Sequence, residues 1–542
     1  MPGDGNSPRG HDEDSSRDVF KTASVPPKRF WLLAAGVSIS LFLTLIDSSI
    51  VATSLYTIGI EFEAAETVNW VALSYTLAYL SCVVTFSRLS DVVGRRDTFL
   101  AGQAIFVAFS LACGFSQNLH QLIIFRTLQG IGGSELCPPH LEQHIGSLIG
   151  IVLAGSGVLG PVLGGILTHY ADWRWIFWIN GPVGFVSVAL FWLTWPGAEQ
   201  LPTLQRRRWR EFDALGSLLI IAASTLVVFA FQNAGESFGT VWAQAVFIAP
   251  LVLGICCWIA LLLWGNLVTR RFGDRIALVF PVNLFRNRVY ASAALSTLLL
   301  GFPYLLLLFS FPLREQAVSG KSALAAGLML LPMLGTTALG SVIVGKINTT
   351  RNYLFESLLA GAALMLLACG LLTLVSGPDD DPKALGFLTF AGLGFGLSTS
   401  AATMIAAVEA PIKDYAPAQG ILAQLRILGG SLGITSSSVL VHTQSSKYLA
   451  GILAPKDKAS AGSSGSNLTS EQMEAVRQAY SKAFQLGMAT AAGIAGVAVL
   501  VACLAYKRTR ISIQEKRENL ATEETARRTA QGKSPPGAKD PV

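Results

Sequence analysis

The sequence predicts an all-α protein that crosses a membrane many times, and two observations carry this prediction. Hydrophobic residues make up 51% of the 542 residues, whereas charged residues make up only 14%. A soluble globular domain has a charged fraction of about 25%. Apolar runs of about 20 residues, the length at which a helix spans the hydrocarbon core, recur along the chain. The mean hydropathy of +0.51 agrees with this. The composition therefore excludes a soluble globular protein.

Fourteen apolar runs are long enough to be membrane-spanning helices. We predict them at roughly 30–53, 68–87, 98–116, 119–137, 145–168, 174–195, 213–233, 242–264, 288–310, 322–346, 354–376, 384–409, 417–442 and 483–506. The first run is too long for the core of a signal peptide and lacks a small-residue cleavage pattern, so it should be a retained span. The polar, charged segments 1–28 and 507–542 are predicted to be disordered tails.

The distribution of Lys and Arg predicts the orientation of the spans. One set of alternate loops carries most of the basic residues, which are Arg88, Arg95, Arg96, Arg206, Arg207, Arg208, Arg210, Arg270, Arg271, Arg275, Arg286, Arg288, Lys346, Arg351 and Lys413. The positive-inside rule places these loops, and both termini, in the cytoplasm. Because the basic residues lie in short loops and in the tail, the net charge of +6 does not indicate a nucleic-acid partner. The longest loop on the other side, about 443–482, contains the sequon Asn467-Leu468-Thr469, so we predict glycosylation of Asn467.

Several kinds of chemistry have no residues to support them. The seven cysteines mostly lie in apolar runs and form no C-x-x-C pair, so we interpret them as packing residues and expect no metal site. No phosphate-binding loop of the G-x-x-x-x-G-K-[ST] kind is present, which argues against an ATP-driven pump. No nucleophile arrangement or paired acid–base cluster stands out. We therefore expect no catalytic residues, no enzyme activity and no cofactor.

The fifth predicted span is unusually rich in glycine. Each Gly would cost a soluble helix about 1 kcal/mol and Pro161 about 3 kcal/mol relative to Ala. In a bilayer the segment stays helical, because its backbone has no other hydrogen-bonding partner. Its small residues should form a flat packing face with a kink, and they are Gly157, Gly160, Pro161, Gly164 and Gly165. This pattern, G-x-x-G-P-x-x-G-G-x-L, closely resembles the antiporter motif of the major facilitator superfamily, which in that family marks proton-coupled exporters.

An acidic residue, Asp47, lies inside the first predicted span. A charge there costs at least about 2.5–3.5 kcal/mol, so Asp47 should face the bundle interior or a water-filled path. The family has a similar acidic residue in its first span, where it is linked to proton coupling. The alternative is that Asp47 hydrogen-bonds Ser48 or Ser49 near the membrane interface.

A basic residue, Arg126, lies inside the fourth predicted span. It belongs to an R-x-x-Q-G-x-G pattern that matches the fourth-span motif of the family, whose Arg is implicated in proton transfer. From the rise of a helix, Asp47 and Arg126 should lie about 9 and 10 Å below the same membrane surface. We therefore expect these two opposite charges to form an ion pair, and protonation of Asp47 to release Arg126.

The loop between the second and third spans resembles the cytoplasmic motif of the same family, G-x-L-a-D-r-x-G-r-k. The matching residues are Asp91, Gly94, Arg95 and Arg96, whereas Ser87 stands where the family has Gly. We expect a charged latch, in which Asp91 caps a helix or binds an Arg across the interface between two bundles. The alternative is an ordinary positive-inside turn.

The resemblance covers most of the chain. W-R-W-x-F-x-I-N-x-P-x-G at 173–184 is similar to a sixth-span motif, to which we assign a structural role. The arrangement resembles the fourteen-span drug:proton antiporters, most closely the fungal multidrug and toxin exporters. That implies a major facilitator fold, with a six-helix bundle at 30–195, two extra central helices at 213–264 and a second six-helix bundle at 288–506.

The second half offers candidate residues for a substrate cavity. Arg426 lies inside the thirteenth span and needs a partner, for which Glu409 is one option. Large side chains that could line a cavity for apolar or cationic compounds are Phe302, Tyr304, Phe395 and Met404. The alternative for each is packing or lipid contact, which is the more common position of a Phe on an apolar helix.

The resemblance implies proton-coupled export of amphipathic organic compounds, such as drugs, toxins or secondary metabolites. The expected partners are a small-molecule substrate, protons and the lipid bilayer, and we expect a monomer in the plasma membrane. One departure stands out, because segment 134–144 leaves the fourth span short and its loop without Lys or Arg. Two alternatives therefore stay open. They are a vacuolar carrier of basic amino acids or siderophores, and a non-transporting membrane sensor on the same scaffold.

Overall fold

The structure is a computed structural model. It describes residues 27–62, 68–134, 152, 155–156, 159–160, 162–168, 170–195, 208–236, 244–271, 276–348, 351–377, 380–411, 414–448, 470–508, 515–516 and 522. Apart from one isolated bridge between Phe212 and Ala277, the regular structure of these residues is helical.

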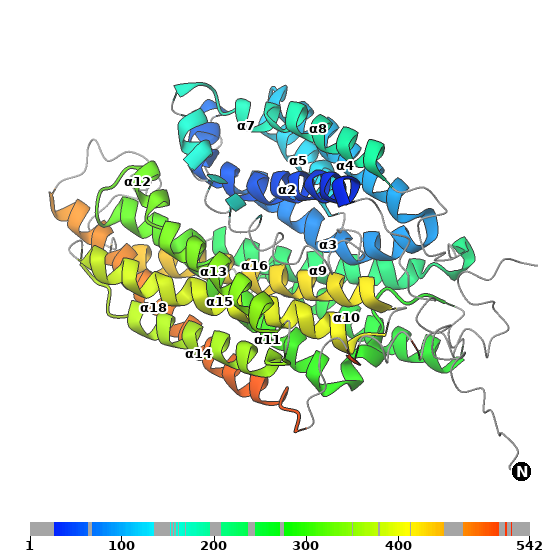
Figure 1. Ribbon diagram of the computed structural model, residues 1–542. Coiled ribbons are helices and arrows are strands. Elements are labelled where there is room, and N and C mark those ends of the chain that lie inside the picture. Colours follow the sequence, from blue (N-terminus) through cyan, green and yellow to red (C-terminus); the bar gives the residue numbers. More distant parts are fainter. Residues whose placement is uncertain are drawn as a thin grey trace, which may run out of the picture.

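Figure 1 shows the helices of the described residues. Those of the first half are α2 (Pro27–Glu61), α3 (Asn69–Val93), α4 (Arg95–Gly114), α5 (Leu119–Gly133), α7 (Trp175–Trp178) and α8 (Asn180–Thr194). The next are η2 (Trp209–Glu211), α9 (Ala214–Glu236), α10 (Ala245–Arg271) and η5 (Val282–Arg286). The second half comprises α11 (Arg288–Ala317), α12 (Ala323–Leu328), α13 (Leu331–Ile347), α14 (Leu354–Leu372), α15 (Asp381–Glu409), α16 (Tyr415–Tyr448) and α18 (Ser470–Cys503).

Among the described residues, eleven helical stretches are long and apolar enough to cross a membrane. Several predicted boundaries are wrong, since α2 continues past residue 53 to Glu61 and α10 past residue 264 to Arg271. The ninth span continues past residue 310 to Ala317, and α18 begins at Ser470, so much of the predicted loop 443–482 is helix. Asn467, most of both predicted tails and all of segment 134–144 except Ser134 lie outside the described residues, as does much of the fifth span.

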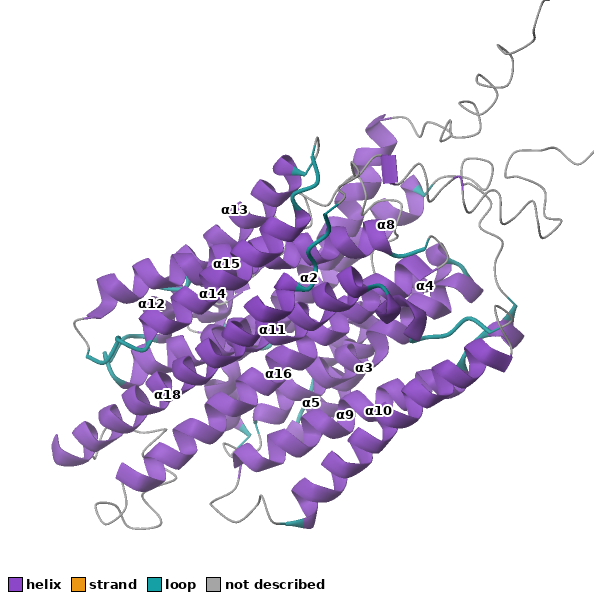
Figure 2. Cartoon of the chain, turned by 90° about the horizontal axis from the view of Figure 1, so that it is seen from below, coloured by secondary structure: helices purple, strands orange, loops and turns teal. Residues whose placement is uncertain are grey.

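The helices gather into two groups with α3 and α16 between them (Figures 1 and 2). In the first group, α2 packs on α8 and α5 packs on α3 and α4. In the second, α11 packs on α16 and α18, while α15 packs on α13 and α14. The extra pair, α9 and α10, joins at the junction, because α9 contacts both α3 and α16.

The chain alternates between two ends of the assembly. We call the end that holds Gly94, Asp213 and Asp414 the basic end, after its Lys and Arg, and the other the opposite end. At the basic end, the buried Asp213 ties the extra pair to the chain that follows it. Its carboxylate accepts hydrogen bonds from the Gly216 amide (2.8 Å), the Trp264 indole (2.9 Å) and the Val279 amide (3.2 Å).

Candidate functional site

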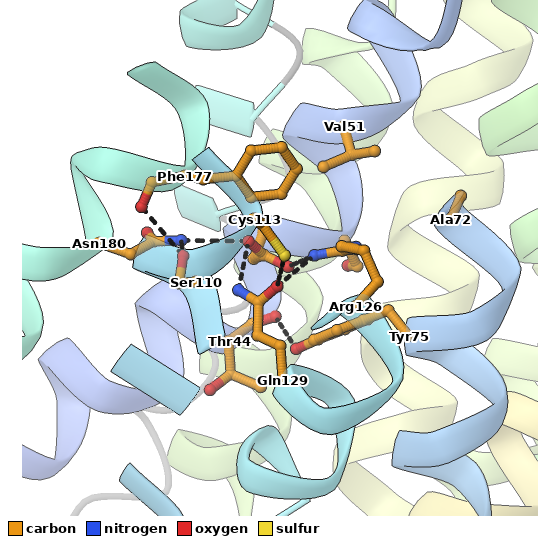
Figure 3. Close-up of polar contacts among 12 residues, drawn as sticks. Thr44, Val51, Ala72, Tyr75, Ser110, Cys113, Arg126, Gln129, Phe177 and Asn180 are labelled. Carbon is orange, nitrogen blue, oxygen red and sulfur yellow. Dashed lines mark hydrogen bonds and ion pairs between the residues drawn. The ribbon is translucent and has the colours of Figure 1, made fainter. Parts of the chain in front are cut away.

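A buried ion pair joins Asp47 of α2 to Arg126 of α5 (Figure 3). The predicted pairing is confirmed: Arg126 Nη1 contacts Asp47 Oδ2, and neither side chain has any exposed surface. Ser48 and Ser49 instead donate to backbone carbonyl groups one turn earlier in α2. A charge this far from water is stable only beside an opposite charge with its other hydrogen bonds satisfied. The surrounding helices of the first half must therefore supply hydrogen-bond partners for both charged groups.

Two amides complete the shell of the Asp47 carboxylate. Gln129 Nε2 donates to Asp47 Oδ1 over 3.0 Å, and Asn180 Nδ2 donates to the same oxygen over 3.1 Å. Asn180 also donates to Ser110 Oγ over 2.9 Å. Figure 3 shows these groups approaching one point from α4, α5 and α8. Because both carboxylate oxygens are engaged, the ionised form of Asp47 is well solvated by the protein.

The guanidinium of Arg126 is held from several sides. Its Nε donates to the Val71 carbonyl (3.1 Å) and its Nη1 to Gln129 Oε1 (2.9 Å). Its centre lies 4.3 Å from the ring centroid of Tyr75, a cation–π geometry. Its Nη2 has no hydrogen-bond partner among the described residues. Arg126 therefore keeps contacts on α3 and α5 that do not depend on Asp47.

Sequence reasoning missed the amides of this site. Gln129 could have been found, because a spacing of three residues places it on the same helix face as Arg126. Asn180 had been assigned a purely structural role in the sixth-span motif, yet it contacts Asp47 directly. Tyr75 carried no motif at all. Only the packing of α3 on α5, and of α8 on α2 and α4, reveals these contacts.

The glycine-rich motif lies beside the ion pair. A Cβ on Gly160 would be 1.9 Å from Ser49 Oγ, two residues along α2 from Asp47. Ser49 Oγ also donates to the Ser156 carbonyl over 3.3 Å. Gly164 is buried, and Gly165 faces Leu324 of α12 in the second half. Gly157 and Pro161 lie outside the described residues. Gly160 therefore permits a backbone approach that a larger residue would prevent.

The charged latch differs from the prediction in its main residue. Arg88, not Asp91, crosses to the second half: its Nη2 donates to Asp414 Oδ1 (2.8 Å), and its Nε to the Leu278 carbonyl (2.6 Å). Asp91 instead lies near Arg88 (3.4 Å) and Arg95 (3.8 Å) on its own side. Asp91 therefore supports the crossing residue and makes no cross-bundle ion pair among the described residues.

The turn that carries the latch depends on Gly94. This residue ends α3 and precedes α4 with φ 115°, a conformation that L side chains rarely adopt. Its amide donates to the Ser90 carbonyl over 3.1 Å. Arg96 is half-buried, and its Nε has no hydrogen-bond partner among the described residues. Gly94 thus sets the angle between the two helices that flank the latch.

The candidate cavity residues do not form one group. Tyr304 and Phe395 stack with ring centroids 3.6 Å apart, and Phe302 packs against the same core cluster. Met404 packs against a different core cluster. Arg426 neighbours Tyr304, so three elements of the second half meet there. Glu409 is not the partner of Arg426, because it binds Asn287, Lys507 and Lys516 at the basic end.

A second ionic cluster lies at the opposite end of the second half. Arg314 pairs with Glu315, and Lys321 bridges Glu315 (3.2 Å) and Asp381. Arg314 also donates to the Gly377 carbonyl over 2.6 Å. Glu315 has no exposed surface. The sequence reading missed this cluster because the predicted span stopped at residue 310. It ties the end of α11 to the start of α15.

Comparisons with known proteins agree on one family. The sequence model described as Major Facilitator Superfamily matches residues 37–284. The MFS-type transporter FPY5 of Fusarium mangiferae is 30% identical over 437 residues, which cover 76% of this chain and 72% of the relative. The MFS-type efflux pump LUC4 of a Fusarium species is 29% identical over 477 residues, covering 84% and 81%. A crystal structure of a bacterial homologue of the human lysosomal transporter Spinster shares the fold, with a TM-score of 0.55 and 14% identity over 89% of this chain and 97% of that one.

Proposed function

The chain belongs to the major facilitator superfamily of membrane transporters, and we propose that it exports amphipathic organic compounds in exchange for protons. The observation that carries this proposal is the buried Asp47–Arg126 pair with its two amide donors. A relative of similar length is named an efflux pump, which supports the outward direction. We place the protein in the plasma membrane as a monomer.

The chemistry follows from the charge balance of the pair. While Asp47 is ionised, its charge cancels that of Arg126, and the amides of Gln129 and Asn180 satisfy its remaining oxygen. When Asp47 takes up a proton, Arg126 loses its counter-charge and keeps only the Val71 carbonyl, Gln129 and the Tyr75 ring. Breaking a buried pair costs about 3–5 kcal/mol. A change of that size is comparable to the roughly 5.5 kcal/mol that inverts a two-state equilibrium from 1:99 to 99:1.

The neighbouring elements would convert this local change into movement. Gly160 brings the glycine-rich segment against Ser49, so a shift of α2 at Asp47 acts directly on that segment. At the basic end, Arg88 of α3 pairs with Asp414, which precedes α16. This ion pair must break if the two halves separate there. Proton binding in the first half and release of the Arg88 latch would then be two parts of one conformational change.

The test is drug and toxin accumulation in pump-deficient yeast that expresses the chain. Expression should lower accumulation, and a protonophore should abolish that effect. Asp47→Asn at equal surface expression should lose protonophore-sensitive export. Normal export by this variant, with unchanged pH dependence, would contradict the proposed role of Asp47.

The same experiment separates the alternatives. Vacuolar localisation with uptake of basic amino acids or siderophores would replace the proposed export. Correct surface localisation with no change in accumulation would favour a sensor, and restoring a longer connection at 134–144 would then separate a sensor from a transporter impaired by that shortening.

A further inference from the structure

A second intramembrane cation, Arg426, lies near the middle of α16. Because α16 begins at Tyr415, Arg426 is roughly 16 Å along the helix at 1.5 Å per residue. That is about half of the 30 Å hydrocarbon core. The backbone is tightly held at this point, because a Cβ on Gly301 of α11 would be 2.3 Å from the Arg426 carbonyl oxygen. The backbone of α16 at Arg426 is therefore fixed near the middle of the membrane, close to α11.

Arg426 differs from the other deeply placed arginines. Arg126, Arg88 and Arg314 each pair with a carboxylate. For Arg426, no ion pair or hydrogen bond to another described residue is present, and its Nε is buried without a partner. Its side chain is only half-buried, so part of it stays accessible. A cation in this position is costly unless an anion or a hydrogen-bond acceptor joins it.

One tyrosine from each half of the protein lies near enough to Arg426 to act on its charge. Its electrostatic neighbours are the phenol groups of Tyr79 in α3 and Tyr304 in α11. Tyr304 stacks on Phe395 at 3.6 Å, and Tyr79 stacks on Tyr75 at 6.4 Å. Tyr75 is the ring beneath Arg126. A row of rings thus extends from the proposed proton site to Arg426, at the junction where α3 meets α16.

We propose that Arg426 binds the anionic group of the transported compound, and that the half-buried ring of Tyr79 contacts its aromatic body. This inference rests on the proposed function and narrows its substrate class to aromatic organic anions. A guanidinium forms short, charge-assisted and often paired hydrogen bonds with a carboxylate. Tyr79 is only half-buried, so its ring can contact an aromatic body attached to that group, whereas Tyr304 is buried against Phe395. The cationic compounds expected from the sequence would instead meet a like charge here.

The test compares two xanthene dyes of opposite charge on the purified full-length protein in detergent. Fluorescein carries the carboxylate, and tetramethylrosamine is a cation built on the same ring system. We expect the wild type to bind fluorescein more tightly than tetramethylrosamine. Arg426→Gln should weaken fluorescein binding by about tenfold or more and leave tetramethylrosamine unchanged or improved. Arg426→Lys keeps the charge but loses the paired donors, so its affinity for fluorescein should lie between those of the wild type and Arg426→Gln.

The control is Arg208→Gln, which makes the same change of net charge at an exposed site of the basic end. It should bind both dyes like the wild type. Equal affinity of the wild type for the two dyes, no binding of either, or an Arg426→Gln variant that binds fluorescein normally would overturn the inference. The dye preference of the wild type needs no variant, so it decides the question even if Arg426→Gln does not fold.

Export assays in yeast separate this inference from the proposed function. If fluorescein binds in an Arg426-dependent manner but protonophore-sensitive export is absent, the inference stands and the proposed export fails. If export is proton-driven and Arg426→Gln leaves the charge preference of export unchanged, the proposed export stands and the inference about Arg426 fails.

Discussion

Arg126 and Asp47 form their ion pair without any contact with solvent, since neither side chain has exposed surface. The pair should therefore behave as a unit. Arg126→Gln leaves a buried carboxylate without a counter-charge and should destabilise the protein by about 3–5 kcal/mol. The double variant Asp47→Asn/Arg126→Gln should recover more than half of that loss. The melting temperature in detergent measures both, and strictly additive losses would show that the two residues do not interact.

The contact between Gly160 and Ser49 gives a second prediction. Gly160→Ala should strongly reduce export, because its Cβ would lie 1.9 Å from Ser49 Oγ and force the two helices apart beside Asp47. Ser49→Ala removes that nearest atom and should partly restore export. Gly165→Ala is the matched control, since its Cβ would meet Leu324 at an ordinary 3.7 Å. Equal effects of the two glycine variants on dye export would contradict the proposed close approach.

The pair formed by Arg88 and Asp414 gives a third prediction. Arg88→Gln and Asp414→Asn should each weaken the hold of α3 on α16 and lower the export rate. The double variant should be little worse than Arg88→Gln alone, because both changes remove the same contact. Exchange of the two charges, Arg88→Asp with Asp414→Arg, should restore part of the rate. Arg210→Gln, at an exposed site, is the control for surface charge.

Asp380, which precedes α15 at the opposite end, gives a prediction about pH. Its pKa lies well below the ordinary value, because Lys383 and the backbone amides of Ser376 and Gly377 donate to its carboxylate. A lowered pKa adds stability above the unfolded-state value of about 4, and this is lost as the pH falls through the lowered pKa. The melting temperature of Asp380→Asn should therefore lie below that of the wild type at neutral pH and approach it in acid. A difference that stays constant with pH would refute this.

The sequence predicted the class of fold and the pairing of Asp47 with Arg126, but not the amide groups around that pair. Long apolar runs predict membrane spans directly. The depths of Asp47 and Arg126 below the membrane surface follow from the rise of a helix. The rotation of each helix does not follow in the same way. Lipid-facing and buried positions are similarly apolar, so periodicity does not show which face looks inward. The contact of Asn180 with Asp47 was therefore not predictable, because it depends on how α8 packs.

Contacts between distant segments were also beyond the sequence. Arg88 and Asp414 are 326 positions apart, and nothing in the sequence around either residue indicates a contact with the other. The prediction chose Asp91 as the latch because it is the acidic residue of the motif. The structure shows that the long side chain of Arg88 reaches where the shorter Asp91 does not. Likewise, the predicted boundary at residue 310 left the Arg314–Glu315 pair outside the span, whereas α11 continues to Ala317.

The anchoring of Asp213 has a consequence for the path of the chain. The chain enters the extra helical pair at Phe212 and is back beside the same point at Ala277, where the Ala277 amide donates to the Glu211 carbonyl over 2.8 Å. The two attachment points of the pair thus lie side by side. The second half therefore starts from the same end of the molecule at which the pair began, and the two added helices do not exchange the ends of the helices that follow.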